Sequence, residues 1–379
     1  MKRTLVVGGT GPTGPFIVNG LLQRGRQVTI FHRGTHEIPE IPDQVHHIHG
    51  DPHFIETIQA ALDGHHFDEV IATYGRIRLI AEALAGKVER FISIGGVAAY
   101  RGFGNPRLLH PPGLATPVPE NAPLAHDETE ERFGLLIAQT EQAVLAYHPS
   151  GTVFRYPYVY GPYQLVPREW SIVRRVLDGR PHILLPDGGA SLSTHGWAGN
   201  LAHAVLAAFD QPEVSAGKIY NCGDLQQLTV RQIVEVIAEA LGRRIRTVSI
   251  PWEVAGPAKS LSLGGRYHQV MDLSMLRRDL GYTDVLASTE ALARTARWYV
   301  DNRPDASYEE RLGDPFDYEW EDRMVDHAAV ALAGWQGLAG PARAPATASG
   351  EHPERSPGFR PHPYAHPKDA NEARDHRGR

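Results

Sequence analysis

The segment VVGGTGPTGPF at residues 6–16 constrains the fold of this chain more than any other feature. It places Gly8, Gly11 and Gly14 between an apolar strand and a helix. In such a turn the first glycine permits the bend, the second lets backbone approach a pyrophosphate, and the third allows close helix–sheet packing; the helix N-terminus favours an anion. The alternative is a glycine-rich turn without a ligand. The residues expected to contact a dinucleotide here are Gly8, Thr10, Gly11, Pro12, Thr13 and Gly14.

The first half of the chain alternates strands with helices. Short runs rich in β-branched residues at 3–9, 27–34, 45–51, 68–73 and 90–96 are separated by segments with apolar residues at helical spacing, at 15–25, 53–64 and 76–86. This alternation predicts an α/β fold, a Rossmann-type doubly wound parallel sheet covered on both faces. After the next strand, at 152–161, the rhythm loosens, which indicates a smaller C-terminal substrate lobe.

The chain divides into three parts. We expect an NAD(P)-binding domain at residues 1–165, with later segments returning to it, and a substrate-binding lobe at 166–330. From Gly334 the composition turns to Pro, Ala, His and Arg without an apolar period, so residues 334–379 are predicted to be a disordered tail.

Composition limits the classes of partner. The 379 residues carry a net charge of −6, so there is no basic excess to neutralise the phosphates of nucleic acid. No signal peptide and no apolar run long enough for a membrane helix is evident. The single cysteine fits a reducing compartment. We therefore expect a cytoplasmic protein with a small-molecule substrate and neither nucleic acid nor membrane as partner, and we leave a homodimer open.

The end of the second strand, TIFHRG, indicates which dinucleotide binds. Where an acidic residue would hold the ribose hydroxyls of NAD, this chain has His32 and Arg33, and a guanidinium pairs well with a 2′-phosphate. This favours NADP(H) over NAD(H), although Arg33 has an alternative interpretation as a solvated charge. Asp51, after the third strand, is placed either to contact the adenine or to cap a helix.

Several segments together resemble a known family. GGTGPTG, RFISIGGVAAY, RYPYVYGP and MLRRDLGY…TARWYVDNRP, in that order over residues 1–303, are similar to the extended short-chain dehydrogenases/reductases. The chain looks most like the atypical NAD-dependent epimerase/dehydratase-like branch, which includes the plant chloroplast stem-loop-binding proteins. The resemblance implies a Rossmann domain, a substrate lobe and hydride transfer with a Ser or Thr, Tyr and Lys set. In that set the tyrosine exchanges the proton.

This chain departs from the family at each position of that set. The serine position falls on Gly96, and YxxxK aligns with FGLLIAQTE, where Glu141 keeps the family's register. Phe133 then replaces the tyrosine and Ile137 the lysine. Because neither side chain can transfer a proton, the family's mechanism does not carry over unchanged.

Other groups are candidates for the missing chemistry. We single out Tyr100, which follows the fifth strand, as the candidate proton donor, with a structural role as the alternative. The family arrangement puts Tyr158 beside the nicotinamide, and we expect Arg168, His195 and Trp197 to face the substrate. No metal site is predicted.

Two functions remain from the sequence. The first is an NADP(H)-dependent epimerase/dehydratase-like or reductase-like enzyme that acts on a small carbonyl or sugar-like metabolite with a non-standard proton donor. The alternative is a catalytically degenerate NADP(H)-binding sensor or regulatory protein. RNA binding, a third class, is disfavoured by the acidic balance of the chain.

Overall fold

The computed structural model describes residues 1–339. The chain forms two compact units, Met1–Val325 and Asp326–Arg379. In the second unit only helix α12 (Tyr318–Ala339) is described, and it begins in the first unit.

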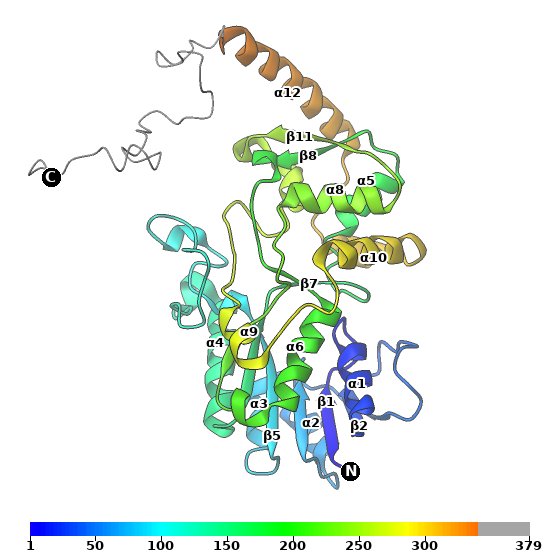
Figure 1. The fold of residues 1–379 in the computed structure, drawn as a ribbon, viewed down its shortest axis with the longest axis vertical. Coiled ribbons are helices and arrows are strands. Elements are labelled where there is room, and N and C mark those ends of the chain that lie inside the picture. Colours follow the sequence, from blue (N-terminus) through cyan, green and yellow to red (C-terminus); the bar gives the residue numbers. More distant parts are fainter. Residues whose placement is uncertain (340–379) are drawn as a thin grey trace, which may run out of the picture. The chain divides into compact units, whose positions relative to one another are not determined.

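A seven-stranded parallel sheet forms the base of the first unit (Figure 1). Its order, β10-β6-β5-β4-β1-β2-β3, confirms the predicted doubly wound fold. The order reverses between β1 and β4, and ligands of such sheets bind at this point, beyond the carboxyl ends of the strands. The strands are β1 (Arg3–Val7), β2 (Gln27–His32), β3 (His46–His49), β4 (Glu69–Ala72), β5 (Arg90–Gly96), β6 (Thr152–Tyr156) and β10 (Ile219–Asn221).

Helices cover both faces of the sheet, because alternate residues of each strand point to opposite sides. Val6 and Ile30 pack in one core with α1 and α6, and Leu5 and Val7 pack in another with α2, α3 and α4. The first layer comprises α1 (Gly14–Gln23), α6 (Ala198–Asp210) and α9 (Ser274–Leu280), and the second comprises α2 (Ile55–Leu62), α3 (Ile77–Ala83) and α4 (Glu128–Tyr147).

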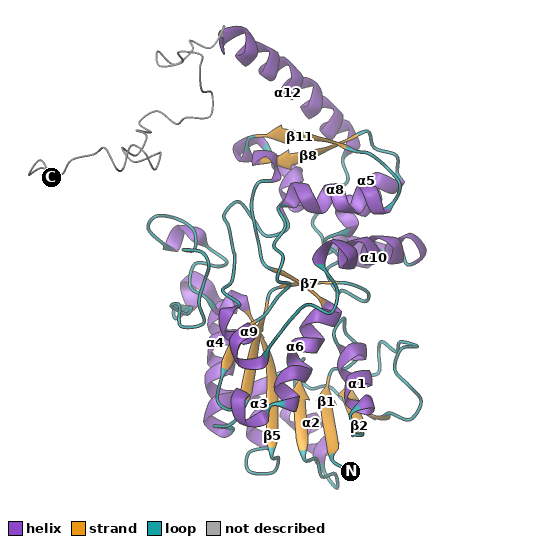
Figure 2. Ribbon diagram, in the orientation of Figure 1, coloured by secondary structure: helices purple, strands orange, loops and turns teal. Residues whose placement is uncertain are grey.

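A smaller lobe lies beyond the carboxyl ends of the strands (Figure 2). It contains a parallel strand pair, β8 (His182–Pro186) and β11 (Arg246–Ile250), with helices α5 (Trp170–Leu177), α8 (Val230–Ala240) and α10 (Ser288–Asp301). The pair β7 (Tyr158–Tyr160) and β9 (His195–Trp197) lies between the lobe and the sheet. The short helices are α7 (Pro212–Ser215) and α11 (Ala306–Glu310).

Two features bear on the predicted divisions of the chain. Helices α6 and α9 and strand β10 follow residue 165 but pack on or within the main sheet, so the Rossmann layer takes segments from well beyond that residue. Helix α12 continues through Gly334 to Ala339, which corrects the predicted start of the tail; the rest of the predicted tail lies outside the described residues. None of the helices up to residue 339 is long and apolar enough to cross a membrane.

Candidate cofactor and substrate cleft

The glycine turn between β1 and α1 has the geometry of a phosphate cradle. Gly8 has a φ of +103°, which L side chains rarely adopt. A Cβ on Gly14 would lie 2.2 Å from the carbonyl oxygen of Gly9, whereas a Cβ on Gly11 would meet no atom within 4 Å. The turn is therefore tight where α1 packs on the sheet and open where a ligand would approach.

This turn forms one wall of a cavity of about 390 Å³, which we name the glycine-turn cavity. Its charged lining is cationic: Arg33 follows β2, and Arg311 comes from the segment after α11, whereas no Asp or Glu is among its lining residues. The Arg33 guanidinium stands over the ring of Tyr74 at 5.4 Å. The lining includes all six residues predicted from the glycine motif, together with His32, Arg33, Gly34, Thr35, His36, Thr73, Tyr74, Ile94, Tyr156, Val159, Leu165, Tyr308 and Arg311.

Asp51 does not line this cavity. Its carboxylate accepts hydrogen bonds from the backbone N–H of His53 at 3.0 Å and pairs with the His53 ring at 2.7 Å. These bonds lower the pKa of Asp51. The structure supports its alternative interpretation as a residue that orders the turn before α2.

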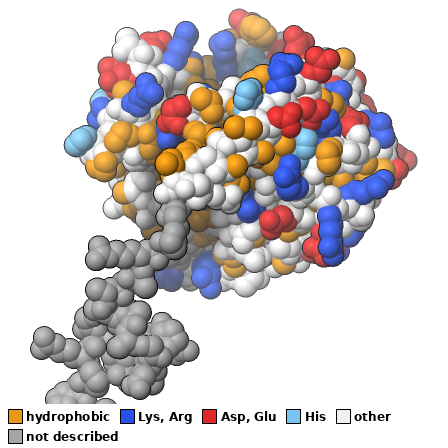
Figure 3. Space-filling model, turned by 90° about the horizontal axis from the view of Figure 1, so that it is seen from above, with side chains coloured by type: hydrophobic (Ala, Val, Ile, Leu, Met, Phe, Trp, Pro, Cys, Tyr) orange, Lys and Arg blue, Asp and Glu red, His pale blue; other side chains and the backbone are white. Residues whose placement is uncertain are grey.

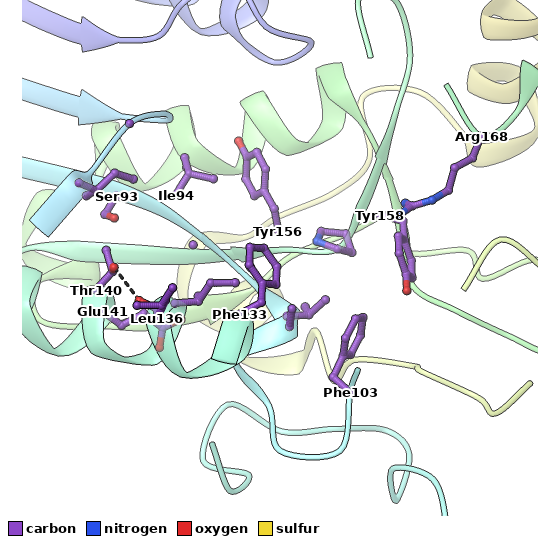
Figure 4. A pocket seen from close by; sticks show the side chains of 18 residues that line it. Ser93, Ile94, Phe103, Phe133, Leu136, Thr140, Glu141, Tyr156, Tyr158 and Arg168 are labelled. Atoms are coloured by element: carbon purple, nitrogen blue, oxygen red, sulfur yellow. Dashed lines mark hydrogen bonds between the residues drawn. The ribbon is translucent and has the colours of Figure 1, made fainter. Parts of the chain in front are cut away.

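A second cavity of about 490 Å³, the α4 cavity, adjoins the first. Ile94 and Tyr156 line both cavities and so form a shared wall. One side of the α4 cavity is apolar, formed by Phe133, Leu136 and Ile137 of α4 (Figure 4). The hydroxyl of Thr140, one turn further along α4, donates to the carbonyl oxygen of Leu136 at 2.8 Å.

Buried polar contacts hold α4 in place. Glu141 accepts three hydrogen bonds from the Arg155 guanidinium, at 2.9, 3.2 and 2.7 Å, and both side chains are buried. Glu131, at a kink near the start of α4, accepts the backbone N–H of Gly102 at 3.0 Å. The helix therefore presents Phe133 and Ile137, the predicted replacements of the family's tyrosine and lysine, to the cavity.

Phe133 and Ile137 differ in their surroundings. Phe133 lines the cavity yet is 71% exposed, so few protein atoms contact it. Ile137 packs near Gly96, where a Cβ would lie 3.7 Å from the Ile137 side chain. The three positions predicted to have lost the family's groups, Gly96, Phe133 and Ile137, thus line one cavity.

Tyr158 and Arg168 form the far wall of the α4 cavity. The Arg168 guanidinium stands 4.2 Å from the centre of the Tyr158 ring, and Figure 4 shows the arginine reaching toward that ring. Burial raises the pKa of Tyr158, and the charge of Arg168 opposes that rise. Both residues also line a third cavity of about 300 Å³ with Arg311, so the three cavities share walls.

Tyr100, the predicted proton donor, lies elsewhere. Its side chain is fully buried, its hydroxyl donates to Asn221 at 2.7 Å, and the Arg155 guanidinium stands 4.7 Å from the centre of its ring. Tyr100 lines neither main cavity, and burial raises its pKa. The structure therefore corrects the prediction and assigns Tyr100 a structural role.

His195 and Trp197 also lie behind the cleft and not in its walls. The His195 Nδ1–H donates to the carbonyl oxygen of Ser193 at 2.7 Å, and its ring packs against that of Tyr158 with centroids 5.6 Å apart. Burial lowers the pKa of His195 to about 4. Trp197 packs edge-on against Phe16 of α1 at 5.2 Å. Of the three predicted substrate residues, only Arg168 lines the α4 cavity.

Sequence reasoning missed several lining residues. Tyr156 was passed over because β6 reads as an ordinary buried strand, although it stands four residues before the YGP segment. Ser93 and Thr140 line the α4 cavity but belong to no sequence motif that would have identified them. Arg311 lies about 300 residues from the glycine turn, and only the tertiary fold brings the two to one cavity.

Two family models match the chain. NAD(P)H-binding matches residues 8–115, and the NAD dependent epimerase/dehydratase family matches residues 72–223. Among curated proteins, the chloroplast stem-loop binding protein of 41 kDa b of Arabidopsis thaliana is 27% identical over 257 residues. That match covers 64% of this chain and 64% of the relative, so the chain spans just under two thirds of that protein's length.

Solved structures share the fold. UDP-glucose 4-epimerase from Thermotoga maritima, with UDP-glucose, superposes with a TM-score of 0.64 at 17% identity, covering 80% of this chain and all of that one. The Bordetella bronchiseptica enzyme WbmH, in complex with NAD+, gives a TM-score of 0.64 at 15% identity, covering 79% and 99%. The resemblance inferred from the motifs is thereby confirmed: residues 8–223 match the NAD(P)H-binding and NAD dependent epimerase/dehydratase family models, and the chain shares the fold of solved epimerases.

Proposed function

We propose that the protein is an NADP(H)-dependent, epimerase/dehydratase-like or reductase-like enzyme that acts on a small carbonyl or sugar-like metabolite. The observation that carries the proposal is the shared wall of Ile94 and Tyr156 between the glycine-turn cavity and the α4 cavity. A dinucleotide with its pyrophosphate at the glycine turn would extend its nicotinamide toward this wall. Bound nicotinamide supplies or accepts the hydride at that point.

The charge of the glycine-turn cavity supports NADP(H) over NAD(H). Arg33 and Arg311 bring two guanidinium groups to its lining, and none of its lining side chains is a carboxylate. An NAD-specific site of this fold usually places an acidic residue on the ribose hydroxyls, whereas an arginine there accommodates the 2′-phosphate. A guanidinium can bind such a phosphate through two parallel hydrogen bonds.

The pair of Tyr158 and Arg168 is the proposed proton-transfer group. In the structure the Tyr158 hydroxyl donates to Gln269 Oε1 at 3.2 Å. In carbonyl reduction it would instead donate its proton to the carbonyl oxygen, and the charge of the Arg168 guanidinium, 4.2 Å from the centre of the Tyr158 ring, would stabilise the resulting phenolate. In this scheme Arg168 does for Tyr158 what the lysine does for the family's tyrosine. The apolar wall of Phe133, Leu136 and Ile137 would contact the carbon skeleton of the substrate and exclude water.

Calorimetric titration with NADPH and NADH tests the cofactor half of the proposal. We expect NADPH to bind at least about tenfold more tightly than NADH, and Arg33→Ala to remove most of that difference, since it deletes a charge-assisted contact to the 2′-phosphate. Arg76→Ala, at a nearby arginine that lines none of the three cavities, is the matched control. Equal affinity for both nucleotides would refute the NADP preference, and no binding at millimolar nucleotide would refute the function.

The catalytic half is tested by following NADPH oxidation against a panel of aldehydes, ketones and nucleotide sugars. Tyr158→Phe should lower kcat by about 10²- to 10⁴-fold while NADPH affinity is kept, because only the proton donor is lost. Tyr160→Phe, on the same strand but buried against Asp224, is the control for packing. Unchanged kcat in Tyr158→Phe would exclude Tyr158 as the donor.

A second function would follow from the predicted loss of all three family groups at Gly96, Phe133 and Ile137. In this reading the chain binds NADP(H) as a sensor or regulatory protein. The double variant Phe133→Tyr/Ile137→Lys separates the two functions. A new reductase activity in a protein that had none would mark the native site as degenerate, whereas unchanged or abolished native activity would show that the native protein has its own route.

Nucleic acid is not part of the proposal. The relative named for stem-loop binding shares 27% identity, but this chain carries a net charge of −6. Figure 3 shows Lys and Arg side chains interspersed with Asp and Glu over the face in view. Proteins that track a nucleic-acid backbone gather positive charge along one groove.

A further inference from the structure

Three histidines and one glutamate converge at the edge of the sheet where β2 and β3 end. They are His32, His47, His49 and Glu37, and one ligand atom from each lies within 4.8 Å of all the others. His32 is the last residue of β2, His47 and His49 belong to β3, and Glu37 lies in the connection between the strands. His32 also lines the glycine-turn cavity, whereas Glu37, His47 and His49 do not.

The local fold explains how the four side chains meet. His32 is paired with His49 across the two parallel strands, and His47, two residues earlier, shares the face of His49 because side chains alternate along a strand. Gly34, with a φ of +70°, turns the chain immediately after Arg33, and the following residues bring Glu37 back over the histidines. Two strands and one short loop therefore supply all four groups.

The spacing of the four groups fits a tetrahedral metal ion. His32 Nε2 lies 3.0 Å from His47 Nδ1 and 3.6 Å from Glu37 Oε1. Glu37 Oε1 also lies 3.5 Å from His49 Nε2, and the second carboxylate oxygen, Oε2, lies 3.5 Å from His47 Nδ1. Bonds of about 2.0–2.1 Å to a tetrahedral Zn²⁺ place neighbouring ligand atoms about 3.3 Å apart, close to these distances.

Hydrogen bonding among the groups does not explain their convergence. His32 and His47 share one hydrogen bond, but the carboxylate of Glu37 makes none within residues 1–339, although it faces three imidazoles. A cation bound between the Glu37 carboxylate and the three imidazoles would stabilise this arrangement, because each of the four groups could then bind it directly. The exposed fractions, 5% for His32 and 59% for His49, leave one side open for an ion to enter.

We propose that His32, Glu37, His47 and His49 bind one Zn²⁺ as a closed, four-coordinate structural site. Three imidazoles and a carboxylate suit Zn²⁺ and leave no position for a reacting water, which separates the site from the catalytic centres that keep one open. Bound zinc would link the β2–β3 connection to both strands. The sequence alone did not predict this site, because the four proposed ligands are scattered over residues 32–49 without a known spacing motif.

The zinc content of the full-length, untagged protein tests the proposal directly. We expect one Zn²⁺ per chain after gel filtration of protein reconstituted with ZnCl₂, and a dissociation constant below about 1 μM in competition with a chromophoric chelator. Co²⁺ in place of zinc should give the intense visible absorption of a tetrahedral ion. No retained metal, or only the weak spectrum of octahedral Co²⁺, would refute the site.

The chain has 20 histidines, so variants are needed to test whether the metal binds at the four proposed residues. His47→Ala and Glu37→Gln should each weaken Zn²⁺ binding by at least about 100-fold and abolish the rise in melting temperature that Zn²⁺ causes. His46→Ala is the matched control, because the exposed His46 is adjacent in β3 but points to the opposite face. Glu37 is half-exposed, so Glu37→Gln should fold even if His47→Ala does not. Equal weakening in His46→Ala, or unchanged binding in Glu37→Gln, would overturn the assignment.

Discussion

The two ends of the cleft are specified in different ways. At the glycine turn the backbone itself forms the site: Gly8 has a positive φ, and Gly14 has no room for a Cβ. At α4 the backbone presents a helix face, and the side chains on that face determine the chemistry. A site made of backbone keeps its sequence pattern for as long as the fold does, whereas a site made of side chains can change residue by residue.

At the α4 end, some side chains are constrained by packing and others are not. Glu141 of α4 forms a buried ion pair with Arg155, whereas Phe133 and Ile137, which we predict to stand in place of the family's tyrosine and lysine, line the cavity. A buried charge left without its partner is strongly unfavourable, whereas a residue that faces a cavity contributes little to packing. On one helix, the residues that hold the fold can therefore be kept while the residues that face the cavity change.

The largest effect is expected from breaking that scaffold. Glu141→Ala leaves the Arg155 guanidinium buried without its carboxylate and should lower the free energy of unfolding by about 3–5 kcal/mol, measured by urea denaturation. Gln139→Ala, on the exposed side of the same helix, should change it by less than about 0.5 kcal/mol. Similar losses in both variants would mean that the ion pair does not hold α4.

At the glycine turn, Gly14→Ala should cost about 3 kcal/mol, since the new Cβ would press on the backbone of Gly9 at 2.2 Å. Gly11→Ala is the matched test, because its Cβ meets no atom within 4 Å. It should leave stability nearly unchanged but weaken NADPH binding about tenfold or more in the same titration, because the methyl group stands where phosphate would approach. If Gly11→Ala binds NADPH as the wild type does, the turn is not the cradle.

The buried imidazole of His195, which packs against Tyr158, should make the free energy of unfolding depend on pH. Burial lowers the pKa of His195 from 6.5 to about 4, so below pH 6.5 the unfolded chain takes up a proton that the native protein does not. Stability is therefore highest above pH 6.5 and should fall by about 2 kcal/mol between pH 7 and pH 5 from this group alone.

Other buried groups titrate in the same pH range, so the contribution of His195 is obtained from the difference in stability between the wild type and a His195 variant. The raised pKa of Glu169, about 7, and that of Asp224, about 6, act in the opposite direction. We therefore compare the wild type with His195→Gln by urea denaturation at each pH. Parallel curves for the two proteins would show that His195 titrates normally.

The smallest effect is expected at Phe133. Because its side chain is 71% exposed, Phe133→Ala should change the free energy of unfolding by less than about 0.5 kcal/mol. Ile137→Ala, at the neighbouring and less exposed position, provides the comparison and should cost more. A loss above about 2 kcal/mol in Phe133→Ala would show that the cavity face of α4 is part of the scaffold after all.

The amino-acid sequence was sufficient to predict the parallel sheet and the glycine turn, and it also predicts the loss of the family's reactive pair. These features depend on local patterns: period-two and helical spacing, glycines at fixed offsets, and a register fixed by Glu141. The contacts between side chains distant in sequence follow from the tertiary fold alone. It buried Tyr100 against Asn221, paired Tyr158 with Arg168, brought Arg311 to the glycine turn and gathered His32, Glu37, His47 and His49. Such contacts join residues far apart in sequence or on separate strands, and local spacing carries no information about them until the strand order and the loop paths are known.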